Sequence, residues 1–181
     1  MKTWEGKRLR FALAVSALAF AASALFFWYL HWATERKREL CREKLHDLYV
    51  AASLYSWNQG NSFPPSLGDL LEKTRGPWTF ICPSSGHLPG DINEIASWTD
   101  YGYVSNLSRS DGHPGRVLAF CTPENHAGEG ANVLFVDGSV RWLPVEEFRK
   151  LTNTPSLFFG VDSAKELVEL RSRTKICYPK H

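Results

Sequence analysis

The most apolar part of the chain is a run near its N-terminus. Residues 11–33 (FALAVSALAFAASALFFWYLHWA) contain 23 positions without a formal charge. At ~1.5 Å per residue, a helix of this length would extend about 35 Å, which exceeds the ~30 Å hydrocarbon core of a bilayer. Trp28, Tyr29 and Trp32 gather at the far end of the run, as is typical of an interfacial aromatic belt. The pattern predicts a transmembrane helix.

A cleaved signal peptide is the alternative interpretation of this run. Ala22-Ser23-Ala24 resembles the small-residue site at which such peptides are removed. Cleavage there would leave the apolar residues 25–30 at the new N-terminus, and the run is longer than the apolar region of an ordinary signal peptide. We therefore expect a retained membrane anchor.

The helical pattern continues beyond the apolar run. Cys41, Leu45, Leu48, Ala52 and Tyr55 recur at spacings of three and four, which places them on one face of a helix. The residues 58–61 (NQGN) tolerate left-handed backbone and mark the end of the helix. The sequence predicts one helix over about residues 10–58, whose second half needs a partner surface to cover this apolar stripe.

Short strands and turns are predicted for the remainder. Residues 76–115 are rich in Gly, Pro, Ser and Asp and indicate loops with short strands, and residues 116–121 (RVLAFC) favour a strand. The strongest hairpin signal is Asp137-Gly138 between the apolar runs 132–136 and 139–143, because both turn residues tolerate positive φ. A short helix should begin at Pro144, and Ser163 with Glu166 predicts a capping box for a last helix. The expected fold class is α+β, with a long N-terminal helix packed on a small antiparallel sheet.

Composition and charge divide the chain into two unlike parts. Apolar residues make up 44% and charged residues 22% of the 181 residues, a balance typical of globular proteins. The net charge of +2 combines +5 over residues 1–45 (nine Lys/Arg, four Asp/Glu) with −3 over residues 46–181 (twelve against fifteen). A large nucleic-acid-binding face is therefore not expected in the main body.

Three stretches resemble a known family. They are residues 54–67 (LYSWNQGNSFPPSL), residues 80–84 (FICPS) with Tyr-Gly-Tyr at 101–103, and residues 126–143 (HAGEGANVLFVDGSVRWL). Together they resemble the type IV pilin and type II secretion pseudopilin group, and within it the pilin-like proteins with a C-terminal His…Asp-Gly motif. The motif residues here are His126, Asn132, Asp137 and Gly138.

The resemblance implies a non-enzymatic structural or assembly subunit of an envelope secretion or pilus-type machine. It implies a cytoplasmic N-terminus at 1–10, a transmembrane helix at 11–33 and a pilin-like head at 34–181 in the periplasm or outside the cell. The chain would then be a single-pass protein of the inner (cytoplasmic) membrane. Its expected partners are membrane lipid and other pilin-like subunits or secretion-machine proteins, with no nucleic acid and no small-molecule substrate.

The chain departs from the family pattern at two places. Ten residues separate His126 from Asp137, where the family has nine. The family's processing signal is also absent, because Phe11 follows Arg10 instead of Gly, and Val15 stands where the family has Glu. The second departure favours an alternative function, namely a membrane-tethered extracytoplasmic module that binds a glycan or a protein and does not polymerise.

The candidate chemistry is sparse. His126, Glu129 and Asp137 are weak candidates for a calcium site, but the hairpin turn accounts for Asp137 without a ligand, so no cofactor is expected. Ser84, Ser85 and His87 lack a surrounding nucleophile motif, so no enzyme activity is expected.

The chain has four cysteines and no Cys-x-x-Cys pair, which disfavours a zinc ribbon or a thioredoxin-like site. In an exported head, Cys82–Cys121 is the preferred disulfide, with Cys41–Cys177 as a second one, although four cysteines allow three pairings.

Overall fold

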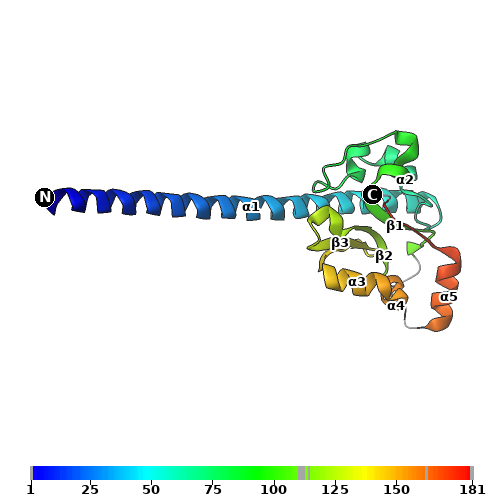
Figure 1. The fold of residues 1–181 in the computed structure, drawn as a ribbon. Coiled ribbons are helices and arrows are strands. Elements are labelled where there is room, and N and C mark those ends of the chain that lie inside the picture. The colour runs from blue at the N-terminus through cyan, green and yellow to red at the C-terminus, as the bar shows by residue number, and fades with distance from the viewer. Residues whose placement is uncertain (1, 110–112, 114, 162, 180–181) are drawn as a thin grey trace. The chain divides into compact units, whose positions relative to one another are not determined.

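The computed structural model describes residues 2–109, 113, 115–161 and 163–179, with side chains from Leu13 onward except that of Ala14. The chain divides into two compact units, residues 1–37 and residues 38–181. Helix α1 (Lys2–Asn58) contributes to both units. The other elements belong to the second unit (Figure 1).

The N-terminal unit is the first part of α1. Within the described residues, α1 contains an 18-residue window with mean hydropathy 1.4, long and apolar enough to cross a membrane. A core helix of a soluble protein can be equally long and apolar, but none of this window is buried. The observed helix thus agrees with the predicted apolar span.

The second unit is built on a five-stranded sheet. Its strands are β1 (Tyr101–Ser105), β2 (Val117–Cys121), β3 (Gly130–Phe135), β4 (Val140–Pro144) and β5 (Lys175–Cys177). They are arranged in the order β4-β3-β2-β1-β5, and each neighbouring pair is antiparallel. The C-terminal strand thereby reaches the edge beside β1.

The second half of α1 supplies one wall of the core. Cys41, Leu45, Leu48 and Ala52 are buried with side chains of the sheet, and Tyr55 packs against them. This is the apolar stripe predicted from the spacing of three and four. The α+β fold class, with a long helix packed on a small antiparallel sheet, is therefore confirmed.

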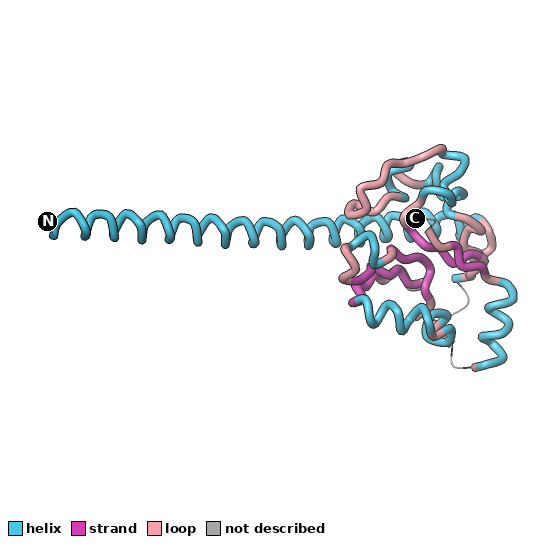
Figure 2. The backbone as a smooth tube through the Cα atoms, in the orientation of Figure 1, coloured by secondary structure: helices cyan, strands magenta, loops and turns pink. Residues whose placement is uncertain are grey.

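Short helices complete the head. Between α1 and β1 lie the 3-10 helices η1 (Leu67–Lys73), η2 (Pro77–Phe80) and η3 (Ile92–Glu94), then α2 (Ile95–Trp98), joined by loops (Figure 2). The 3-10 helix η5 (Pro123–His126) connects β2 to β3. After β4 come α3 (Val145–Asn153), α4 (Pro155–Phe159) and α5 (Ala164–Arg173), of which α3 contacts β3, β4 and α4.

The β3–β4 hairpin is confirmed, but its turn differs from the prediction. Leu134 pairs with Val140, so the connection is longer than the two predicted turn residues. Gly138 has φ +86°, whereas the φ of Asp137 is not positive. Asp137 instead accepts hydrogen bonds at Oδ1 from the Ser139 N–H (2.8 Å) and hydroxyl (2.6 Å). Asp137 therefore stabilises the turn through its side chain, while its own backbone is not left-handed.

The predicted capping box of the last helix is wrong. Ser163 is the N-cap of α5, but its side chain makes no capping hydrogen bond. Glu166 instead pairs with Arg116, at 2.6 Å from Nη2 to Oε1. The Arg116 side chain is 1% exposed, and its Nε also donates to the Phe159 carbonyl at 2.8 Å. A buried guanidinium without an anionic partner costs more free energy than a helix N-terminus without a side-chain cap. Glu166 therefore pairs with Arg116 instead of capping α5.

Candidate functional site

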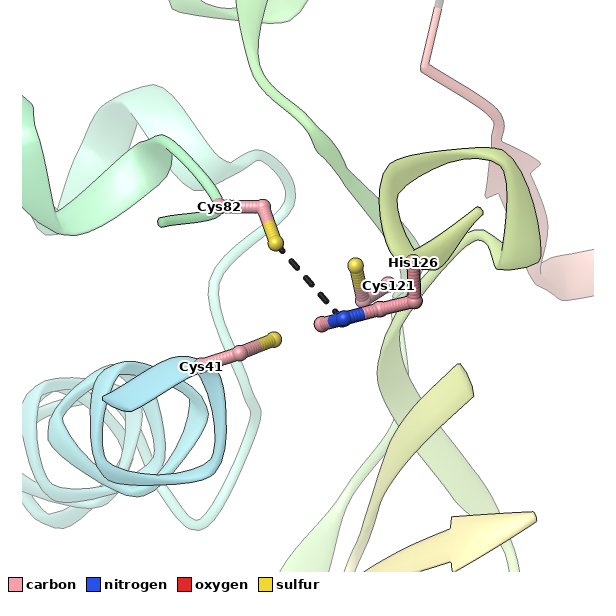
Figure 3. A group of neighbouring side chains, drawn as sticks. All are labelled: Cys41, Cys82, Cys121 and His126. Carbon is pink, nitrogen blue, oxygen red and sulfur yellow. Dashed lines mark hydrogen bonds between the residues drawn. The ribbon is translucent and has the colours of Figure 1, made fainter. Parts of the chain in front are cut away.

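Four side chains from distant parts of the sequence meet inside the head. Cys41 lies on α1, Cys82 follows η2, Cys121 ends β2 and His126 ends η5. Their donor atoms, three sulfurs and one imidazole nitrogen, all lie within 4.8 Å of one another. Figure 3 shows the side chains pointing toward a common centre. The distance from Cys82 Sγ to His126 Nε2 is 3.6 Å.

The cluster is closed to solvent. Cys41 and Cys121 are fully buried, and Cys82 and His126 retain exposed fractions of 1% and 6%. A substrate cannot approach these atoms without opening the core. The Cys82–His126 pair is therefore unsuited to nucleophilic catalysis in this conformation, although it combines the residue types of a thiol enzyme.

The three thiols differ in acidity. The pKa of Cys82 is lowered because the thiols of Cys121 and Cys41 donate hydrogen bonds to its sulfur, with His126 acting in the same direction. Burial raises the pKa of Cys121 well above its usual value. For Cys41, the contact with Cys121 lowers the pKa, but the hydrogen bond to Cys82 and burial outweigh it and raise the pKa to about 12. Cys82 is therefore the first of the three thiols to lose its proton as the pH rises.

Asp100 holds the Cys82 loop in place. The carboxylate is fully buried, and its Oδ2 accepts hydrogen bonds from the Cys82 N–H at 2.8 Å and the Ser85 hydroxyl at 2.5 Å. His87 Nδ1 lies 2.7 Å from its Oδ1. Ser85 and His87, considered above as hydrolase residues, thus belong to the network that orients the Cys82 backbone.

A second group of contacts orients His126 and Cys41. The Trp142 ring stands at 88° to the His126 ring, with centroids 5.2 Å apart, and the Arg38 guanidinium lies 4.4 Å from the Trp142 centroid. Asn132 Nδ2 donates to the Arg38 carbonyl at 3.0 Å, which attaches β3 to α1 one turn before Cys41. The motif residue Asn132 therefore has a structural explanation.

The candidate calcium site is not assembled. His126 faces the three thiols, and Glu129 forms an ion pair with Arg38. Asp137 bonds within the hairpin turn. Among the described residues, the one group of at least three His, Cys, Asp or Glu side chains with metal-site geometry is the thiol–imidazole cluster.

The expected disulfides are also corrected. All four cysteines are free. Cys82 and Cys121 do lie together, as the prediction required, but as thiols that share their surroundings with Cys41 and His126. Cys177 is on β5 and outside the cluster, so it does not pair with Cys41.

Sequence reasoning missed the cluster because its members lack the short Cys-x-x-Cys spacing of familiar metal sites. A signal was nevertheless present, because Cys41 occupies the apolar stripe that had to face the sheet. Three sulfurs and an imidazole can hold a metal ion that prefers soft ligands. Comparisons with family models, curated proteins and solved structures found no match to this chain.

Proposed function

We propose that this chain is a membrane-anchored, non-enzymatic subunit of a pilus-like or secretion assembly in the cell envelope. The observation that carries the proposal is helix α1. It is apolar over a membrane-length stretch, and in its second half it becomes a wall of an antiparallel α+β head. The resemblance of residues 54–67 and 126–143 to pilin-like proteins agrees with this layout.

The closed site supports the non-enzymatic part of the proposal. The donor atoms that combine nucleophile and base chemistry are buried, and the polar residues around them hydrogen-bond to the backbone and to each other. In this proposal the N-terminus is in the cytoplasm and the head outside it, which is the topology of the resembling family. Its partners are membrane lipid and other subunits of the same kind.

Crosslinking within native membranes tests the assembly role. A single cysteine is introduced at successive positions of residues 15–33 in the full chain, and membranes are treated with a bifunctional thiol reagent. Covalent multimers are expected on one face of the helix and should vanish when detergent disperses the membrane first. Monomers at every position would contradict assembly through this helix.

Topology is tested separately with protease added to intact spheroplasts. The head should be digested from outside, whereas the same protein in inside-out vesicles should be protected. The reverse pattern would contradict an extracytoplasmic head.

One observation favours the second candidate function, a tethered binding module that does not polymerise. Arg10 and Val15 occupy the positions at which the resembling family carries its processing signal. N-terminal sequencing of the protein extracted from cells distinguishes the two. An intact Met1 or Lys2 terminus together with monomers in the crosslinking experiment would support the binding module.

A further inference from the structure

We infer that Cys41, Cys82, Cys121 and His126 form a structural zinc site. The inference goes beyond the proposed assembly role and does not depend on it. It starts from the convergence of four zinc-binding side chains, drawn from α1, the segment after η2, and β2 with η5, onto one buried point. Three cysteines and one histidine are among the ligand sets of structural zinc sites.

The distances agree with tetrahedral coordination. With Zn–S bonds of about 2.3 Å and Zn–N bonds of about 2.0–2.1 Å, tetrahedral donors lie roughly 3.5–3.8 Å apart. The distance from Cys82 Sγ to His126 Nε2 is 3.6 Å, and the whole set lies within 4.8 Å. A small contraction of the set would therefore bring all four donors to an ion at the centre.

The donor types select the metal. Calcium and magnesium require oxygen ligands, and the cluster offers none. Thiolates with an imidazole suit zinc, whereas common iron–sulfur clusters use four cysteine thiolates and only three are present. All four protein donors are buried, so no coordination position is open to water, as is typical of a structural rather than a catalytic zinc ion.

The surroundings fit a bound metal–thiolate group. Three thiolates, a neutral imidazole and Zn²⁺ carry a net charge of −1, so nearby donors and cations stabilise the group. Asn125 Nδ2 lies 3.5 Å from Cys121 Sγ, and the Tyr101 hydroxyl lies 3.9 Å from Cys41 Sγ. The Lys44 ammonium, one turn after Cys41, donates to the carbonyls of Trp78 and Ile81 at 2.6 and 2.7 Å and attaches α1 to the Cys82 segment.

Metal content of the purified protein tests the inference. The full-length chain is purified in detergent under reducing conditions and analysed by elemental mass spectrometry, alongside Cys82→Ser and Cys177→Ser. One zinc ion per chain is expected for the unmodified protein and for Cys177→Ser, because Cys177 lies outside the cluster. Zinc should be lost from Cys82→Ser.

Cobalt provides a readout of geometry that does not rely on a ligand-deleting variant. The protein is stripped of metal and titrated with Co²⁺, which should give the intense visible bands of a tetrahedral site and the charge-transfer bands of cobalt–thiolate bonds. His126→Cys keeps four donors, so it should still bind Co²⁺ with shifted bands, even if Cys82→Ser does not fold.

A third experiment tests the hydrogen bond that Asn125 donates to a cluster sulfur. Asn125→Ala removes the donor to Cys121 Sγ and should weaken zinc binding roughly 10–100-fold in competition with a chromophoric chelator. The inference is overturned if the reduced unmodified protein contains no zinc and takes up no Co²⁺. It is equally overturned if Cys177→Ser and Cys82→Ser lose metal alike, or if Cys41, Cys82 or Cys121 is isolated from native protein in a disulfide.

Discussion

Gly138 in the hairpin turn is constrained twice, by its backbone and by its neighbour. Its φ of +86° lies in the region that L-residues rarely adopt. A Cβ at this position would lie 2.5 Å from Cε1 and 2.7 Å from Cζ of Tyr49, a residue of α1. Gly138→Ala therefore combines a backbone cost of about 1 kcal/mol with an overpacking cost of about 1–3 kcal/mol, and we expect a loss of about 2–4 kcal/mol in unfolding free energy.

Gly86→Ala separates the two costs. Gly86 has a similar φ of +75°, but a Cβ there would meet nothing within 4 Å. Its substitution should cost only the backbone part, about 1 kcal/mol. The difference between the two variants, about 1–3 kcal/mol, then measures the contact with Tyr49.

The assay is guanidinium unfolding of the full chain in detergent, followed by near-UV circular dichroism, because this signal reports side-chain packing in the head. Repeating Gly138→Ala in a Tyr49→Ala background completes a double-mutant cycle, in which most of the overpacking cost should disappear. The steric reasoning is refuted if Gly138→Ala costs no more than Gly86→Ala. It also fails if truncating Tyr49 leaves the cost of Gly138→Ala unchanged.

Two further predictions use the same assay. Gly102→Ala would drive a Cβ into the end of the fully buried Phe120 ring and should destabilise the head by about 1–3 kcal/mol, whereas Gly115→Ala, with nothing within 4 Å, should change little; equal costs would contradict this packing. Asn132→Ala removes the hydrogen bond to the Arg38 carbonyl and should cost about 1–2 kcal/mol, and an unchanged midpoint would show that this bond does not hold α1 to β3.

The sequence predicted those elements whose cause is local. The spacing of Cys41, Leu45, Leu48 and Ala52 reports a helix face directly, and burial of that face followed from the need to cover it. Asp137 was correctly assigned to the hairpin, but the predicted reason was wrong, because Asp137 stabilises the turn through hydrogen bonds to its carboxylate and not through a positive φ.

The candidate site was predicted only in part, because it depends on tertiary contacts between residues that are distant in the sequence. Cys82 and Cys121 were expected to meet, but whether two neighbouring thiols oxidise or share a third partner depends on which side chains the fold brings beside them. His126 and Cys41 approach from a 3-10 helix and an α-helix that no sequence spacing links. Glu166 illustrates the same limit, because its capping role was displaced by Arg116, a residue on another element.

The order of the four donors along the chain has a consequence for biosynthesis. Cys41 and Cys82 leave the ribosome before β2 and η5, so the cluster cannot close until Cys121 and His126 have followed. During this interval the two early thiols are exposed to any oxidant at the site of folding. With zinc bound in an extracytoplasmic head, the two proposals made for this chain, metal binding would compete at that moment with a premature Cys41–Cys82 bond, so metal supply and redox conditions would both affect the yield of folded protein.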